Sequence, residues 1–276
     1  MENLAHVEAS LNYQAETSER PVSYQYTPPA GVPSTTRKSD PRTVAIYDGR
    51  PLAREFSLDL QGFTLIGHQS AVTDFYDEQQ VRKIYYPEME RLVKDFTGAA
   101  KTLVFDHIVR SVPKLRRGEQ GVKPPATAVH NDYTLKSAPQ RVRDLLPAAE
   151  AEELLKHRFA VINVWRPIRG PLQDAPVAVC DARTISLKDF VASDLKYPDR
   201  NGEVYTVAYS ATHRWYYFPK MQVNEALLLK CYDSVQDGRA RFTAHTAFVD
   251  PTTPPNDPGR ESIEVRTLVF YPPSES

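Results

Sequence analysis

The chain is poor in cysteine, with only Cys180 and Cys231 among its 276 residues. Two cysteines do not form the disulfide framework that stabilises small secreted domains. This scarcity favours a reducing compartment. We therefore expect a cytoplasmic protein.

Long apolar runs are missing too. No stretch of about 18 apolar residues occurs, so the sequence predicts no membrane-spanning helix. The first twenty residues, MENLAHVEASLNYQAETSER, contain early acidic side chains and lack the apolar centre of a signal peptide. They are polar and without clear periodicity. We expect residues 1–20 to be a mobile terminus and residues 21–276 to form a single domain.

Neither sign of charge dominates. The chain has 34 Lys and Arg residues against 35 Asp and Glu residues, a formal net charge of -1. A balanced surface creates no large field of one sign. Nucleic acids and acidic membranes are therefore not the expected partners.

Glycine is scarce, with 11 residues, whereas proline (23) and tyrosine (15) are frequent. Many prolines among short aromatic and β-branched runs favour a β-rich fold with ordered loops. After residue 158, strand-like runs separated by turn residues are FAVINVWRPI, APVAVCDARTI, EVYTVAYS, HRWYYFPKM, EALLLKCYDS, RARFTAHTAFVD and SIEVRTLVFYP. Their spacing predicts an antiparallel barrel or jelly roll.

Helices are predicted at two places outside these runs. Met89, Val93 and Phe96 lie at helical spacing in a segment that should end at Gly98. A second helix is expected over about 138–156, broken near Pro147. The fold class is therefore mainly β with flanking helices.

The stretch HNDYT places His130 and Asp132 two residues apart. In an extended strand both side chains point to the same face. One imidazole and one carboxylate are two-thirds of the 2-His-1-carboxylate triad, which binds Fe(II) on one side and leaves the other side open. By itself the pair is weak evidence for a metal site, and a polar turn, with Asp132 accepting backbone N–H groups, is the more common alternative.

The third ligand is sought among the remaining histidines. His245 lies in a late strand with apolar neighbours, and a jelly roll brings such a strand beside an earlier one. The others fit less well, because they lie in the mobile start, upstream, at a helix end or at an exposed strand start: His6, His68, His107, His157 and His213. His245 is therefore the best candidate.

Arg260 and Ser262 follow His245 in the segment PGRESIEVRTLVFYP. A guanidinium and a hydroxyl on one strand face suit the carboxylate of a dicarboxylic cosubstrate. Arg266 lies on the same face and competes for this role. Surface ion pairs with Glu261 or Glu264 are the plainer interpretation of either arginine.

Taken together, these motifs resemble the iron(II)/2-oxoglutarate-dependent oxygenases, with their HxD, distal His and RxS pattern on a double-stranded β-helix (jelly roll, cupin-like). The chain is most similar to hydroxylase/desaturase proteins of mostly fungal secondary metabolism, of the gibberellin desaturase and cephalosporin methoxylase subunit types. The stretches that carry the resemblance are RTVAIYDGR, VHNDYT, INVWRPIRGPLQDAPVAVCDART, WYYFPKM, LLLKCYDS, HTAFVDP and RESIEVRTLVFYP.

The resemblance implies that His130, Asp132 and His245 bind Fe(II) and that Arg260, with Ser262, binds 2-oxoglutarate. Other cationic candidates for the cosubstrate are Arg266 and Arg166. Candidates for contacting the substrate are Tyr133, Thr134, Asn163, Trp165 and Lys230. His107 and Arg110 are candidates for supporting the metal ligands.

The implied reaction is oxidation of an unactivated C–H bond of a small molecule by O2, with succinate and CO2 as co-products. Hydroxylation, desaturation and oxidative cyclisation all fit, and an amino acid or a natural-product intermediate is the expected substrate. Two alternatives stay open: an iron oxidase that does not use 2-oxoglutarate, and a non-catalytic jelly-roll partner subunit. The oligomeric state is open, and a homodimer is compatible with the sequence.

Overall fold

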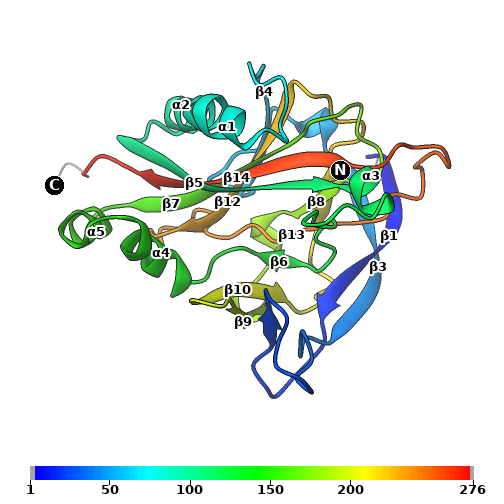
Figure 1. Cartoon of the computed structure of the whole chain (residues 1–276), viewed down its shortest axis with the longest axis horizontal. Helices are drawn as coiled ribbons and strands as arrows, with labels where there is room; N and C mark the ends of the chain where they lie inside the picture. Colours follow the sequence, from blue (N-terminus) through cyan, green and yellow to red (C-terminus); the bar gives the residue numbers. More distant parts are fainter. Residues whose placement is uncertain (1–3, 274–276) are drawn as a thin grey trace.

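Two curved sheets face one another in the computed structural model, which describes residues 4–273 (Figure 1). One sheet has five strands in the order β4-β12-β7-β14-β5, and the other has nine in the order β1-β3-β11-β8-β13-β6-β10-β9-β2. Most neighbouring strands are antiparallel, whereas β11 with β3 and β2 with β9 are parallel. This arrangement is the jelly roll that the sequence predicts.

The bounds of the elements are as follows. The five-stranded sheet contains β4 (Phe63–Gly67), β5 (Lys101–Ser111), β7 (Phe159–Pro167), β12 (Glu225–Asp233) and β14 (Glu261–Phe270). The nine-stranded sheet contains β1 (His6–Gln14), β2 (Val22–Tyr24), β3 (Ser39–Asp48), β6 (His130–Asn131), β8 (Val177–Cys180), β9 (Phe190–Lys196), β10 (Asn201–Val207), β11 (Trp215–Tyr217) and β13 (His245–Ala247). The helices are α1 (Glu78–Gln80), α2 (Tyr86–Thr97), α3 (Val112–Arg116), α4 (Ser137–Leu145) and α5 (Ala148–Leu155). Short helical turns are η1 (Arg50–Leu52), η2 (Val81–Tyr85), η3 (Ala182–Thr184) and η4 (Leu187–Asp189).

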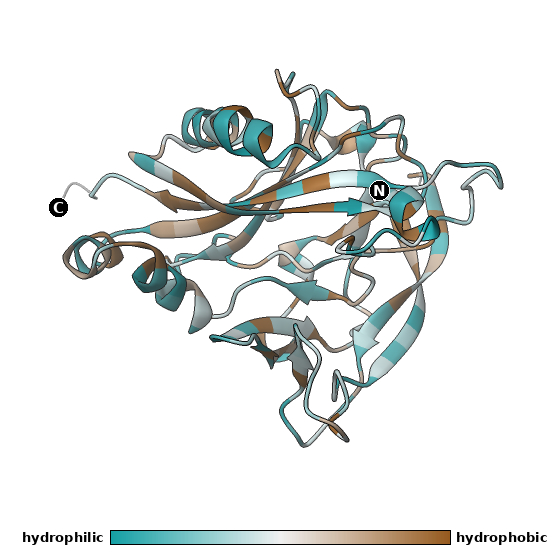
Figure 2. Cartoon of the chain, viewed as in Figure 1, coloured by the Kyte–Doolittle hydropathy of each residue, from teal (hydrophilic) through white to brown (hydrophobic). Residues whose placement is uncertain are grey.

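The five-stranded sheet is buried on both faces. Val161 and Trp165 of β7 belong to the core between the sheets, whereas Ile162 and Val164 belong to a second core that includes Met89 of α2. Burial on both faces explains why β7 is apolar almost throughout, without the alternation of a half-exposed strand. Figure 2 shows the result as long brown stretches on this sheet beneath largely teal helices.

The two predicted helical regions are confirmed. Met89 and Val93 are the buried residues of α2, and Gly98 ends the helix with a left-handed φ of 68°. The second region divides into α4 and α5 at Pro147, which immediately precedes α5. Proline lacks an N–H group and disfavours helical geometry in the residue before it, so the chain turns there.

The N-terminal segment differs from its expectation. Residues 6–14 form β1, which pairs with β3 along its whole length, instead of a mobile terminus; residues 1–3 of that segment lie outside the described part. Leu11 and Tyr13 are each 1% exposed. This strand has few apolar side chains, and they alternate with polar residues that face solvent. The pattern is therefore too weak to predict a strand from the sequence. The domain boundary expected at residue 20 therefore has no counterpart in the sheet.

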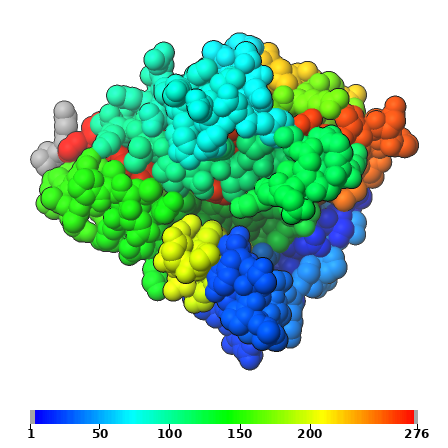
Figure 3. All heavy atoms as spheres, in the orientation of Figure 1, coloured from blue at the N-terminus to red at the C-terminus, as the bar shows by residue number. Residues whose placement is uncertain are grey.

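No helix among residues 4–273 is long and apolar enough to cross a membrane. On the face shown in Figure 3, the surface is hollowed between the green region that follows β5 and the yellow and blue segments below it. This hollow lies over the space between the two sheets.

Candidate metal centre

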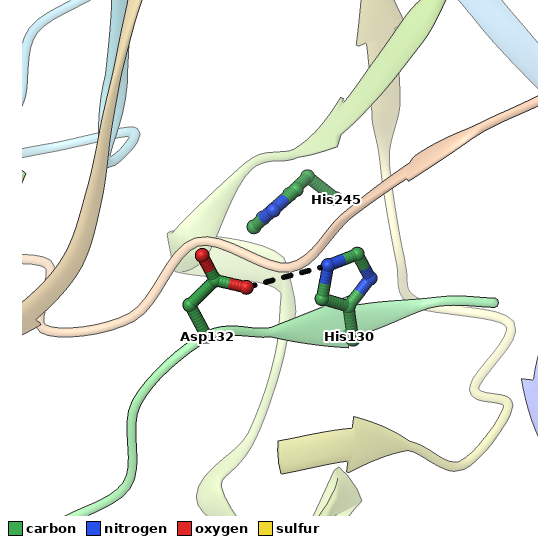
Figure 4. A group of neighbouring side chains, drawn as sticks. All are labelled: His130, Asp132 and His245. Atoms are coloured by element: carbon green, nitrogen blue, oxygen red, sulfur yellow. Dashed lines mark ion pairs between the residues drawn. The ribbon is translucent and has the colours of Figure 1, made fainter. Parts of the chain in front are cut away.

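The side chains of His130, Asp132 and His245 converge between the sheets (Figure 4). One ligand atom from each lies within 4.8 Å of the others. β13 pairs with β6, and this pairing sets His245 directly opposite His130. The late strand therefore lies beside the early one, as the choice of His245 required.

Each imidazole is oriented by a backbone carbonyl two residues before it. Nδ1 of His130 lies 2.7 Å from the oxygen of Ala128, and Nδ1 of His245 lies 2.9 Å from the oxygen of Thr243. A carbonyl can only accept, so both Nδ1 atoms carry the proton and both Nε2 lone pairs are left for a metal. Burial, together with the nearby His130, lowers the pKa of His245 to about 4, which keeps this imidazole neutral as a metal ligand must be.

The carboxylate of Asp132 is held by two donors. Its Oδ2 accepts from Nδ2 of Asn163 at 2.8 Å and from Nε of Arg266 at 2.9 Å. Its Oδ1 lies 3.4 Å from Nε2 of His130, on the side of the other ligands. Burial would raise the pKa of Asp132, but Arg266 and His130 outweigh it and hold the pKa well below its usual range. The group is therefore an anion with one oxygen facing the histidines.

This donor set fits Fe(II). Two neutral imidazoles and one carboxylate on one side of the site are the facial triad of non-haem iron oxygenases, and second partners that orient each ligand are typical of real metal sites. The sequence predicts Asn163 as a substrate contact. In the structure its Nδ2 supports Asp132, and its Oδ1 is buried without a hydrogen-bond partner among the described residues.

Arg266 is surrounded by carboxylates. Besides Asp132, it contacts Asp106 at 2.8 Å and Glu264 at 3.2 Å. Burial and the nearby Asp132 raise the pKa of Glu264. Nothing in the sequence marks Asp106 as a site residue, because only the pairing of β5 with β14 brings it opposite Arg266.

Arg260 has a different environment. Its Nε donates to Oγ of Ser262 at 2.8 Å and its Nη1 to the carbonyl oxygen of Ala175 at 2.9 Å. The guanidinium lies 4.9 Å from the ring centroid of Trp165. Within residues 4–273 it forms no ion pair with a carboxylate, and burial, with a smaller effect of Arg110, lowers its pKa to about 9. A buried cation of this kind is suited to the carboxylate of a ligand.

The indole of Trp165 adds a further donor beside Arg260. Its Nε1 is buried and has no acceptor in the described chain. A guanidinium, a hydroxyl and an unused N–H close together form an anion-binding environment. The residues present therefore fit a cosubstrate carboxylate as well as a metal ion.

Three expected site residues lie elsewhere or serve other purposes. Lys230 is fully buried and its ammonium pairs with Asp233 at 3.1 Å and with Asp59, so it is a structural cation and not a substrate contact. It lies opposite Ile162, on the outer face of the sheet. A single lysine in an apolar run gives no sign of which face it occupies.

Arg166 is the second correction. It faces the outer core, where Nη1 lies 3.1 Å from Nδ1 of His68 and the guanidinium stacks near the rings of Phe75 and Tyr85. It therefore cannot hold a cosubstrate between the sheets. Successive side chains of β7 point to opposite faces of the sheet. Asn163 and Trp165 point to the inner face, so Arg166 points to the outer face.

Thr134 is the third. Its hydroxyl accepts from the backbone N–H of Lys136 at 3.1 Å and of Ser137 at 3.0 Å, where α4 begins. It is a turn residue that starts a helix. Tyr133, by contrast, is 9% exposed and close enough to Asp132 and Arg266 to feel their charges, although burial is the largest cause of its raised pKa.

Of the two residues predicted to support the metal ligands, His107 lies away from the centre and Arg110 lies near it. His107 contacts the hydroxyl of Tyr86 at 2.9 Å and Glu78 at 3.1 Å, which links β5 to the outer helices and not to the metal ligands. Arg110 is largely buried, and Glu264, Arg266 and Asp132 all act on its charge. Only Arg110 therefore lies near the charged cluster of the centre.

Comparison with known proteins agrees with this geometry. Residues 11–270 match the family described as "Oxidoreductase/YMDC permease-like domain". The chain is 35% identical to the hydroxylase/desaturase efuI of Hormonema carpetanum over 98% of this chain and 96% of that protein. It is 34% identical to the Fe(II)/2-oxoglutarate-dependent dioxygenase nvfI of Aspergillus novofumigatus, over 90% of each.

A solved structure supports the same assignment. The iron and alpha-ketoglutarate-dependent endoperoxidase NvfI superposes with a TM-score of 0.86 at 30% identity, covering 96% of this chain and 98% of that one. Its fold is therefore shared nearly end to end. With the converging triad and these relatives, the chain belongs to the Fe(II)/2-oxoglutarate-dependent dioxygenases, in the group of fungal hydroxylase/desaturases.

Proposed function

We propose that His130, Asp132 and His245 bind one Fe(II) and that Arg260, Ser262 and Trp165 bind the distal carboxylate of 2-oxoglutarate. The observation that carries this proposal is the contrast between Arg266 of β14 and Arg260, which immediately precedes that strand. Arg266 is neutralised by Asp132 and its neighbours, whereas Arg260 is a buried cation without a carboxylate partner in the described chain.

Iron and 2-oxoglutarate, when bound, supply the oxidation of a C–H bond by O2 with succinate and CO2 as co-products. The protein's part is geometry. Asn163 and Arg266 occupy Oδ2 of Asp132 and leave Oδ1 toward the metal position. This restriction favours ligation through one oxygen, which keeps space for the cosubstrate and O2.

Tyr133, which follows the HxD pair, and Trp165, on the inner face of β7, provide apolar walls between the sheets, and both are nearly or fully buried. Such walls exclude water from the reacting side of the metal. The substrate is a small molecule, and we propose an amino acid or a natural-product intermediate that undergoes hydroxylation, desaturation or oxidative cyclisation. We further propose that the reaction takes place in the cytoplasm, without nucleic acid, in one oxygenase domain that includes β1. Either a monomer or a homodimer is compatible with this proposal.

The test begins with the purified apoprotein under anaerobic conditions. Titration with Fe(II) should give one bound ion per chain, and admission of O2 with 2-oxoglutarate should give slow succinate formation even without substrate. His130→Ala should lose both. His157→Ala, which changes a histidine just beyond α5, should lose neither.

The alternatives give different results. Fe(II) binding without any binding of 2-oxoglutarate would favour an iron oxidase. No stoichiometric Fe(II) binding by the wild type would favour a non-catalytic partner subunit and overturn the proposed function.

A further inference from the structure

The residue between the two ligands of the HxD motif is fully buried. Asn131 is 0% exposed, and its side chain bonds only to backbone groups. Its Nδ2 donates to the carbonyl oxygens of Tyr133 at 2.7 Å and Cys231 at 2.8 Å, and its Oδ1 accepts from the N–H of Thr243 at 3.1 Å. Two carbonyls on one end and an N–H on the other fix the orientation of the amide.

These three partners lie on three separate segments. Tyr133 follows β6, Cys231 lies in β12 of the opposite sheet, and Thr243 precedes β13. The pairing of β12 with β7 shifts register between Lys230 and Tyr232, so Cys231 is the extra residue of a bulge. A bulge leaves a backbone group without its ladder partner, and Asn131 supplies that partner here.

Thr243 carries the connection on to the distal histidine. Its carbonyl oxygen accepts from Nδ1 of His245 at 2.9 Å, while its N–H is held by Asn131. Its hydroxyl lies 2.8 Å from the carbonyl oxygen of Gly62 and 2.9 Å from that of Lys230. The backbone of Thr243 thus links the two residues: its N–H bonds to Asn131, and its carbonyl oxygen bonds to the imidazole of His245.

Gly62 makes the close approach of Thr243 feasible. A Cβ atom at Gly62 would lie 2.3 Å from Oγ1 of Thr243, well inside contact distance. Gly62 also has a φ of +87°, which glycine adopts without strain. The chain offers a matched position in Gly31, with a φ of +84° and no atom within 4 Å of the equivalent Cβ.

We propose that Asn131 and Thr243 act as one positioning unit that fixes the separation of the HxD pair from His245 before the metal binds. This proposal rests on the proposed iron site and adds the residues that hold its ligands apart. Neither residue touches the metal position. Their effect is exerted through the backbone of β6 and through the orientation of His245, both anchored to the bulge of β12.

The experiment is a titration of folded apoproteins with Co(II), a redox-stable probe of the iron site, followed by calorimetry and by the ligand-field absorption of the bound ion. Asn131→Ala removes the acceptor of the Thr243 N–H, and Thr243→Val removes the hydroxyl that anchors this residue. The carbonyl partner of His245 remains in both variants but is displaced, so Co(II) binding should weaken by about 10- to 100-fold, the range typical of disturbed partners of metal ligands. Thr243→Ser keeps the hydroxyl and should bind nearly as the wild type does.

The glycine pair separates positioning from strain. Gly62→Ala should weaken Co(II) binding and change its absorption spectrum, because Thr243 is displaced. Gly31→Ala carries the same backbone strain and should alter neither. Thermal unfolding and circular dichroism of each apoprotein give its folded fraction, so that Thr243→Val and Gly62→Ala decide the question if Asn131→Ala fails to fold.

Unchanged Co(II) affinity and spectrum in folded Thr243→Val and Gly62→Ala would overturn the positioning role and leave the iron site intact. A wild-type protein that binds no Co(II) or Fe(II) would instead overturn the proposed function. A buried asparagine that only stabilised the fold would lower the unfolding temperature of its variants without changing the spectrum of the bound ion.

Discussion

Two arginines, Arg266 in β14 and Arg260 immediately before it, illustrate how neighbours decide the role of a residue. Arg260 and Arg266 lie six positions apart, and both point between the sheets. Arg266 is paired with Asp132 and further carboxylates, whereas Arg260 is bonded to a hydroxyl and a carbonyl. The first arrangement holds a metal ligand, and the second suits an incoming anion.

Removing one guanidinium should therefore weaken binding of 2-oxoglutarate, and removing the other should weaken binding of Fe(II). Arg260→Gln should weaken 2-oxoglutarate binding by about 2–5 kcal/mol, the usual cost of truncating a buried charge pair, with little effect on Fe(II). Arg266→Gln should weaken Fe(II) binding by roughly 10- to 100-fold. Anaerobic titrations of each ligand check both effects. Arg169→Gln, whose exposed guanidinium pairs with Glu261, is the control, and a reversed pattern would assign the cosubstrate to Arg266.

A substitution of Lys230 tests the structural role of this buried cation on the outer face of the five-stranded sheet. Lys230→Met should destabilise the protein by about 3 kcal/mol, because buried Asp233 loses one of its two cationic partners. Urea unfolding measures this change. Lys156→Met breaks an exposed pair with Glu153 and should change stability by less than about 0.5 kcal/mol. If Lys230→Met left stability unaltered and weakened substrate binding, Lys230 would be a substrate contact and not a structural cation.

Among the elements, β1 shows how a strand at the edge of a sheet is anchored. Tyr13 of β1 accepts a hydrogen bond from Nε1 of Trp215 at 2.7 Å and lies 3.4 Å from Nδ1 of His213. The other ring nitrogen of His213 lies 3.2 Å from Asp189. The side chain of His213 is 0% exposed, contrary to its expected exposure, and it ties the N-terminal strand to the body of the nine-stranded sheet.

This histidine should make stability depend on pH. Burial lowers the pKa of His213, and the hydrogen bond to Asp189 opposes the shift without cancelling it. The unfolded chain then binds a proton at a higher pH than the folded chain, so stability is full above about pH 6.5 and falls as the pH drops below it.

Urea unfolding between about pH 5 and pH 8 measures the effect. His213→Gln should remove up to about 1.4 kcal/mol per pH unit from the slope below pH 6.5. The same slope in the variant and the wild type would show that folding does not lower the pKa of His213.

At the scale of the molecule, the two halves of the proposed site come from different sheets. His130 and His245 belong to the nine-stranded sheet. Ser262 belongs to β14 of the five-stranded sheet, and Arg260 immediately precedes this strand. Fe(II) and 2-oxoglutarate bound together would therefore connect the two layers of the jelly roll. Ligands that bind only the folded state stabilise it by mass action.

A thermal shift should report this connection. At about 100 times the dissociation constant, binding contributes about 2.7 kcal/mol and should raise Tm by roughly 5 °C. Under anaerobic conditions, 2-oxoglutarate should add to the shift only when the metal is present, and Asp132→Ala should show neither increment. An equal shift from 2-oxoglutarate in the absence of metal would contradict a shared site.

Much of the architecture follows from local sequence. Short strand-like runs separated by turn residues predict the jelly roll, the spacing of Met89 and Val93 predicts α2, and Pro147 predicts the break between α4 and α5. These features depend on local backbone preference and on the alternation of side chains, which are written along the chain. The HxD pair was visible for the same reason.

Which polar side chains meet depends on tertiary contacts. Lys230 and Arg166 lie on the outer face, Asn131 bonds across both sheets, and Arg266 is opposite Asp106. Strand register and a one-residue bulge set these contacts, and a shift of one residue reverses the face of every side chain that follows. Local sequence specifies that a residue lies in a strand, but the partner strands determine what its side chain touches.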